Sequence, residues 1–206
     1  MTDTINNVSS QAVRKATGKT WDEWIAFLDE KGARDKTHKE IVNLLSTGHY
    51  IESAWWGQMV TVGYELARGS RMVGETATAG FEIGVQKTIP ISRQKTWKLI
   101  TSPEGIKTWL GDMPNLRFKV GCRYETTDGT SGVIRSIKHG ERIRLTWQPR
   151  GRANPATLQI GLVPTGNKTS VRIHHERLVD EAERVQMREH WRETLERLNK
   201  LATRNV

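Results

Sequence analysis

Three of the six histidines stand next to carboxylates in a pattern that could bind a metal ion or transfer protons. They are His174, His175 and His190, with Glu176 and Glu189 as neighbours. Imidazole nitrogen and carboxylate oxygen are common zinc ligands. In a β-strand, however, the side chains of His174 and His175 point to opposite faces of the sheet, so they cannot bind one ion without distortion. We therefore expect no metal site, no cofactor and no catalytic residue.

The same alternation gives His175 a second interpretation. It places this side chain on the face of Ile173, the face that the strand must bury. A histidine in an apolar pocket can orient a ligand or titrate near neutral pH. The alternative is a core histidine that is hydrogen-bonded to another buried polar group. We keep both interpretations, and His175 is the one polar residue of the candidate ligand site.

Two further motifs suggest chemistry that the surrounding residues do not support. Residues 16–20 match the end of a phosphate-binding loop, but Val13 occupies the position where the motif needs glycine. Thr20 is better interpreted as a helix cap. The only cysteine, Cys122, lies beside Arg123, a neighbour that favours a reactive thiolate. With no histidine near it in the sequence, we interpret it as an ordinary thiol.

Positive charge is concentrated in the later part of the chain. The chain carries 32 Lys and Arg against 23 Asp and Glu, a net charge of +9. Residues 1–75 contain 9 Lys and Arg against 10 Asp and Glu, so residues 76–206 carry a net charge of +10. Arg142 and Arg144 alternate with apolar residues, so no aromatic platform faces the charge, and nucleic-acid binding is disfavoured. We expect a solvated basic face or a surface for an anionic protein partner.

The composition is typical of a soluble globular protein. Hydrophobic residues make up 36% of the 206 residues, and no apolar run approaches the roughly 18–20 residues that cross a bilayer. The first residues lack the basic and apolar segments of a secretory signal. A single cysteine cannot form an internal disulfide. We therefore expect a cytoplasmic protein without a membrane span.

The first third of the chain has the capping residues of short helices. Thr20–Glu23 and Thr37–Glu40 are capping boxes, in which Thr and Glu side chains satisfy each other's free backbone amides. A third helix is predicted from about 53 to 68. It is apolar on two sides, which must both be covered, by the rest of the chain or by a second copy in a dimer. These patterns predict a helical module over residues 1–70. Its core is expected to contain three tryptophans: Trp21, Trp24 and Trp55.

The period of the pattern changes after a glycine-rich linker at 71–80. Residues 81–90 alternate apolar and polar side chains, as a half-buried strand does. Two short helices follow, and then short strands separated by turn signals such as Asp128-Gly129, which indicate an antiparallel meander. A long helix begins at about Asp180 and is the only element long enough to cover one face of the sheet. Residues 81–206 are thus predicted to form an α+β domain, separate from the all-α N-terminal module.

Two parts of the chain resemble known families. The first resemblance is carried by Lys87–Ile91, Trp97, Ile100–Glu104, Trp109, Gly129–Gly132, Arg144–Trp147, Thr169–Val171 and His190–Trp191. Through these segments, residues 82–201 resemble a helix-grip domain of the SRPBCC superfamily, which shares the fold of the birch-pollen allergen. Within it they are most similar to the activator of the Hsp-90 chaperone ATPase. Residues 17–69 resemble a small uncharacterised bacterial helical domain, through Thr20–Trp24, His38–Val42 and Trp55–Glu65.

The helix-grip resemblance implies an antiparallel sheet wrapped around the long C-terminal helix, with a cavity that in relatives holds lipids, hormones or polyketides. We therefore predict non-enzymatic binding of a small, largely apolar molecule, lipid or polyketide-like. The alternatives are a solid core, a protein-interaction module like the chaperone activator, and a cyclase- or hydrolase-like enzyme. The predicted ligand-binding residues are Trp109, Tyr124, Leu145, Trp147, His175, Met187 and Trp191.

Overall fold

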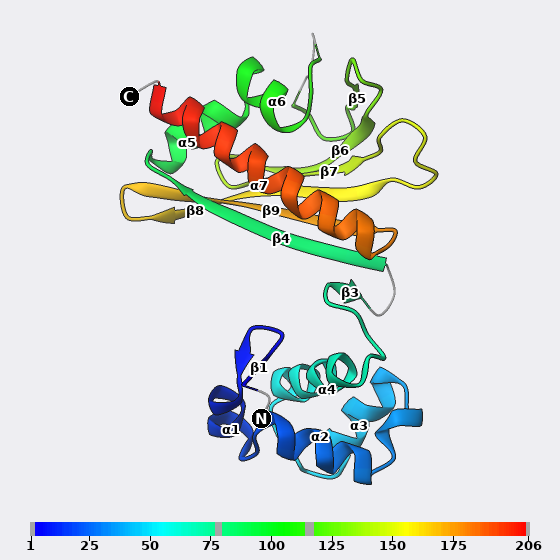
Figure 1. Cartoon of the computed structure of the whole chain (residues 1–206). Helices are drawn as coiled ribbons and strands as arrows, with labels where there is room; N and C mark the ends of the chain where they lie inside the picture. The colour runs from blue at the N-terminus through cyan, green and yellow to red at the C-terminus, as the bar shows by residue number, and fades with distance from the viewer. Residues whose placement is uncertain (1–2, 77–79, 114–117, 205–206) are drawn as a thin grey trace. The chain divides into compact units, whose positions relative to one another are not determined.

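The computed structural model describes residues 3–76, 80–113 and 118–204. Contacts between residues divide the chain into two compact units, Met1–Ala77 and Thr78–Val206 (Figure 1). Each unit has its own hydrophobic core. We refer to them as the N-terminal unit and the C-terminal unit.

The N-terminal unit is built from short helices that follow a small hairpin. Its elements are β1 (Thr4–Ile5), β2 (Val8–Ser9), α1 (Ser10–Thr17), α2 (Trp21–Glu30), a 3₁₀ turn (Ala33–Asp35), α3 (His38–Thr47), α4 (Ala54–Arg68) and, within the predicted linker, β3 (Glu75–Thr76). The hairpin was not predicted. Its turn residues, Asn6 and Asn7, have positive φ angles of 50° and 62°. Asparagine adopts such angles more readily than most residues, so this pair is the signal that could have revealed the turn.

Both predicted capping boxes are present. The Thr20 hydroxyl accepts a hydrogen bond from the Glu23 amide, and the Glu23 carboxylate accepts one from the Thr20 amide at 2.7 Å. Thr37 and Glu40 make the same pair of bonds at the start of α3. Gly18 ends α1 with a φ of 81°. The residues that matched part of a phosphate-binding loop therefore terminate and cap helices, as predicted for Thr20.

The core of the N-terminal unit contains two of the three tryptophans that were predicted to lie in it. Trp21 and Trp24 are buried, but the prediction for Trp55 is wrong, because 59% of this residue is exposed. The buried face of α4 carries Val60 and Tyr64 together with two glycines, Gly57 and Gly63. Because glycine allows close approach, this face packs against α2 and α3. Trp55 lies in the first turn of α4 and is exposed, although the apolar residues on its side of the helix predict burial.

Close packing between α4 and α2 leaves no room for a side chain at Gly63. A Cβ atom there would overlap the Trp21 ring, whereas a Cβ atom at Gly57 would have no atom within 4 Å. We expect Gly63→Ala to destabilise the N-terminal unit by about 1–3 kcal/mol through overpacking. The matched variant Gly57→Ala is expected to stabilise it by about 0.5–1 kcal/mol through helix propensity. Hydrogen exchange of the α2 and α4 amides measures the change in stability caused by each variant. Equal changes for Gly63→Ala and Gly57→Ala would contradict this packing.

The C-terminal unit is an antiparallel sheet with one long helix across it (Figure 1). Its elements are β4 (Gly80–Ile89), α5 (Arg93–Ile100), α6 (Pro103–Trp109), β5 (Arg123–Glu125), β6 (Ser131–Lys138), β7 (Arg142–Trp147), β8 (Ala156–Thr165), β9 (Lys168–Leu178) and α7 (Glu181–Arg204). Within this unit the strands follow the order β4-β9-β8-β7-β6-β5, and neighbouring strands are antiparallel. The sequence predicted this succession of a strand, two short helices, a meander and a long helix.

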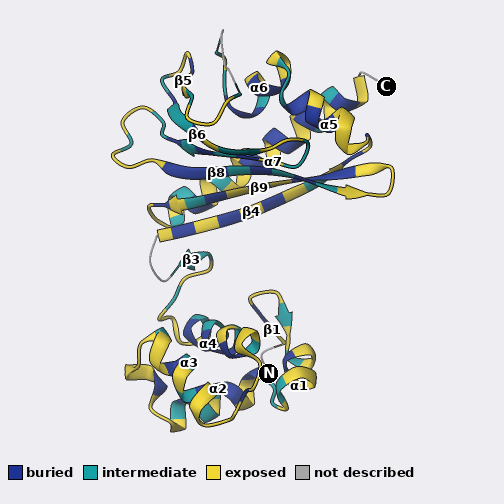
Figure 2. Ribbon diagram, turned by 180° about the vertical axis from the view of Figure 1, so that it is seen from behind, coloured by how far each residue is buried: buried dark blue, intermediate teal, exposed yellow. Residues whose placement is uncertain are grey.

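The helix α7 covers one face of this sheet. Buried and exposed residues alternate along β4, as the dark and light bands of Figure 2 show. The inward side chains of the strands share one core cluster with Trp191, Leu195 and Leu198 of α7. This arrangement confirms the predicted α+β helix-grip fold. Among the described residues, no helix is both long and apolar enough to cross a membrane.

Candidate functional site

His175 lies on the face of the sheet that α7 covers. It is fully buried in β9, whereas the adjacent His174 is exposed, as the alternation predicted. The strand register places His175 beside Leu158 of β8 and Ile83 of β4. The two histidines therefore face away from each other and do not form a joint metal site. Nowhere in the described ranges do three metal-binding side chains cluster.

A hydrogen bond from α7 fixes the protonation of the His175 ring. The Trp191 indole N–H donates to His175 Nδ1 over 2.9 Å. An indole nitrogen can only donate, so Nδ1 is the acceptor and carries no proton. The proton of the neutral ring is therefore on Nε2. This second nitrogen is buried and has no hydrogen-bond partner among the described residues.

The surroundings of His175 keep the ring neutral. The Trp147 ring lies roughly perpendicular to it at a centroid distance of 4.9 Å, and the Trp191 ring at 5.7 Å. Burial lowers the pKa of His175 from 6.5 to about 3, with smaller contributions from the positive charges of Arg152 and His190. At neutral pH the ring is thus an uncharged hydrogen-bond donor packed between two aromatic rings.

A second buried donor lies on the sheet-facing side of α7. Arg184 is 8% exposed, and its Nε has no hydrogen-bond partner within the part of the chain that is described. Its Nη2 is 3.4 Å from Glu181 Oε1. Trp191 follows seven residues later, about two helical turns along the same side of α7. Arg184 is not among the predicted site residues, and its spacing from Trp191 is the one sequence signal that places it on the buried side.

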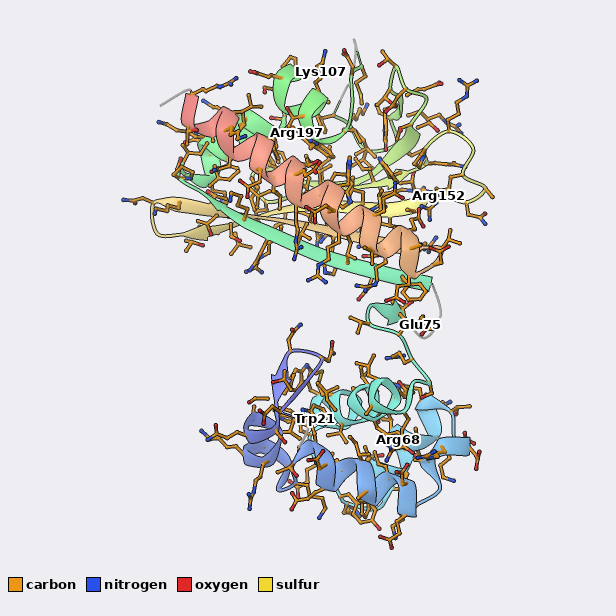
Figure 3. All side chains as sticks on the ribbon, in the orientation of Figure 1. Trp21, Arg68, Glu75, Lys107, Arg152 and Arg197 are labelled. Carbon is orange, nitrogen blue, oxygen red and sulfur yellow. The ribbon has the colours of Figure 1, made fainter. Side chains whose placement is uncertain are left out.

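Arg152 links the loop before β8 to the start of α7 (Figure 3). Its guanidinium pairs with the Glu183 carboxylate and donates to the carbonyls of Asn154 and Arg177 at 2.7 and 2.6 Å. The Glu183 carboxylate also accepts a hydrogen bond from the Val179 amide at 2.6 Å. These contacts fix the point at which α7 departs from β9, and so help to position the helix over the sheet.

The remaining predicted ligand-binding residues belong to the same core, but their polar groups are already satisfied. The Tyr124 hydroxyl donates to the Thr146 carbonyl at 2.7 Å, and the Trp109 indole N–H donates to the Ile100 carbonyl at 2.8 Å. Burial raises the pKa of the Tyr124 hydroxyl, which stays neutral. Of the two apolar residues in this group, Leu145 is buried and Met187 is half-buried.

Five hollows on the described surface, with volumes of 330–560 Å³, lie elsewhere. Their linings do not include Trp147, His175 or Trp191, and one of them includes Tyr124. Because His175 is fully buried, a ligand reaches its Nε2 only after neighbouring side chains move. The structure therefore brings these three predicted residues together as a packed cluster that retains one buried donor without a partner among the described residues, His175 Nε2.

Comparison with known proteins supports the fold of the C-terminal unit. The model of the family described as "Activator of Hsp90 ATPase homolog 1-like protein" matches residues 90–203. No curated protein matches the chain. The N-terminal unit lies outside the family match.

Several solved structures share this fold. The crystal structure of MLL2253 from Mesorhizobium loti has a TM-score of 0.52 and 20% identity, over 61% of this chain and 98% of that protein. CalU16 from Micromonospora echinospora has a TM-score of 0.53 and 20% identity, over 61% and 78%. DynU16, from the dynemicin biosynthetic locus, has a TM-score of 0.51 and 17% identity, over 58% and 46%. At these identities the likeness shows the fold alone.

Proposed function

The chain belongs to the family of Activator of Hsp90 ATPase homolog 1-like proteins, and we propose that its C-terminal unit binds a small, largely apolar molecule beneath α7 without catalysing a reaction. The observation that supports this proposal most is the unpaired Nε2–H of His175. A buried donor without an acceptor costs about 1–3 kcal/mol. An acceptor oxygen on a bound molecule would recover that energy.

The chemistry of the cluster defines the ligand that it would accept. His175 contributes only a donor at Nε2, so the ligand must bring an acceptor such as a carbonyl oxygen. The rings of Trp147 and Trp191 contact the His175 ring, and Met187 packs against the same core cluster, so the rest of the ligand must be apolar. Burying that surface contributes roughly 25 cal/mol per Å². The half-buried Met187 is the flexible side chain best suited to move aside, because methionine adapts readily to different shapes.

An aromatic ketone tests this proposal against its hydrocarbon analogue. We expect 2-acetylnaphthalene to bind the protein about 2- to 13-fold more tightly than 2-ethylnaphthalene, which lacks the acceptor, because one hydrogen bond contributes about 0.5–1.5 kcal/mol. Tryptophan fluorescence measures both affinities. Imidazole ¹H–¹⁵N NMR reports the His175 Nε2–H directly. Its signal should shift when the ketone is added but not when the hydrocarbon is added.

Two variants serve as controls for this experiment. His175→Phe removes the donor and is expected to abolish the preference for the ketone. His174→Phe changes the exposed neighbour on the same strand and is expected to leave the preference intact. The proposal would be overturned if neither compound bound saturably and native mass spectra showed no co-purified small molecule.

The family description favours one other function, a protein-interaction role of the kind that an ATPase activator performs. In that case a protein partner would co-purify with the chain, and its capture would weaken with salt because the C-terminal unit is basic. His175→Phe would leave this capture unchanged, since the side chain is buried.

A further inference from the structure

On the face of the sheet opposite α7, a glycine on one strand lies between two arginines on the neighbouring strands. The register pairs Arg142 of β7 with Gly161 of β8, and Gly161 with Arg172 of β9. Both arginines are exposed. Neighbouring strands lie about 4.8 Å apart, so the two arginines start about 10 Å from each other. Their long side chains can converge above the glycine between them.

The missing side chain at Gly161 leaves a hollow in this face. A Cβ atom at this position would find its nearest neighbours, backbone oxygens of Glu141 and Arg172, at 3.9 and 4.0 Å. The hollow has a volume of about 430 Å³ and is lined by Lys138, Glu141, Arg142, Gln159, Gly161, Leu162, Val163, Arg172 and His174. Its size suits a small molecule rather than a polymer. The lining has no aromatic residue besides His174, so it offers no stacking platform for a nucleobase.

The charges around the hollow are unevenly paired. Lys138 and Glu141 form an ion pair at 2.7 Å on its rim, and Arg93 lies 3.9 Å from the same carboxylate, so neighbouring cations balance the negative charge of Glu141. Arg142 and Arg172 make no hydrogen bond and no ion pair within 4.0 Å among the described residues, although the charge of Arg142 interacts at longer range with Glu141, so both guanidinium groups keep their donors available for an anion. A guanidinium group presents two parallel donors that match the oxygens of a phosphate.

We propose that this hollow, which we call the Gly161 hollow, binds a small soluble phosphate monoester between Arg142 and Arg172. The phosphate accepts hydrogen bonds from both guanidinium groups, and the glycine floor lets it approach the sheet. The Gln159 amide and the His174 ring at the edge of the hollow supply further donors to the organic part of the ligand. The Gly161 hollow lies on the opposite face of the sheet from His175, so it is independent of the ligand proposed beneath α7.

Titration with glycerol 3-phosphate, followed by amide NMR, tests this proposal. We expect saturable shifts centred on Gly161, Arg172 and His174, and no shifts with glycerol. Arg142→Gln and Arg172→Gln are each expected to weaken binding at least about tenfold. Lys168→Gln removes an exposed positive charge outside the hollow and is expected to leave the affinity within twofold of the unmodified protein.

A further variant separates a shaped hollow from general positive charge. Gly161→Val keeps every charge, fits the strand, and fills the floor of the hollow, so it is expected to abolish the saturable shifts. Binding by Gly161→Val as tight as that of the unmodified protein would overturn the proposal. So would shifts that scatter over the basic surface without saturating. Saturable binding of a single-stranded oligonucleotide, with none of glycerol 3-phosphate, would overturn it in favour of a nucleic-acid surface.

Discussion

Replacing Trp191 with alanine is expected to destabilise the C-terminal unit by about 3–5 kcal/mol, the usual cost of removing a buried tryptophan. Trp191 is fully buried and contacts the rings of both Trp147 and His175. Its loss creates a cavity beneath α7 and also leaves His175 Nδ1 without a donor. Hydrogen exchange of the β8 and β9 amides, measured as a function of urea concentration, gives the stability of this unit separately from that of the N-terminal unit.

Trp191→Phe separates the ring from its N–H group. The phenyl ring fills most of the space, but His175 Nδ1 loses its partner, so we expect a cost of about 1–3 kcal/mol. Imidazole NMR is expected to show a mixture of the two neutral tautomers instead of the Nε2–H form alone. Arg192→Ala, which changes the next, exposed residue of α7, is expected to stay within about 0.5 kcal/mol of the unmodified protein. If Trp191→Phe kept full stability and the single tautomer, the Trp191 bond would not control His175.

The sequence was sufficient for the features that depend on local chemistry. Strand alternation placed His175 inside and His174 outside, because successive side chains of a strand point to opposite faces. The capping boxes at Thr20 and Thr37 located the starts of α2 and α3, because they satisfy amides within three residues of each other. The succession of elements in the C-terminal unit followed from the same kind of local pattern.

Features that depend on contacts distant in the sequence could not be predicted. The bond between Trp191 and His175 spans 16 residues and depends on where α7 crosses β9, which the alternation of either element does not specify. The prediction for Trp55 is wrong because the buried face of α4 includes Gly57 and Gly63, and the role of a glycine there becomes visible only when Trp21 packs against Gly63. Arg184 lies seven residues before Trp191, but a long charged side chain on a helix is usually solvated, so this spacing alone does not predict its burial.

The buried His175 is also expected to make the C-terminal unit sensitive to acid. Its pKa is about 3 in the folded protein and 6.5 when exposed, so the unfolded chain binds a proton in this range that the folded protein does not. The contribution of His175 to the free energy of unfolding is therefore constant above pH 6.5. As the pH falls from 6.5 toward 3, this residue lowers the free energy of unfolding by about 1.4 kcal/mol per pH unit. Unfolding free energies measured between pH 7 and pH 4 report the slope.

A non-titrating side chain at position 175 isolates this effect from other groups that titrate in the same range. Gln can accept the Trp191 indole N–H, so His175→Gln is expected to fold and to lose about 1.4 kcal/mol per pH unit of the slope below pH 6.5. The neighbouring His190, whose pKa burial also lowers, is present in both proteins and cancels in the comparison. His174→Gln, on the exposed face of the same strand, is the matched control and should retain the slope. Equal slopes for His175→Gln and the unmodified protein would mean that water already reaches the imidazole and lets it take up a proton in the folded state, and the burial that makes His175 a neutral donor would be refuted.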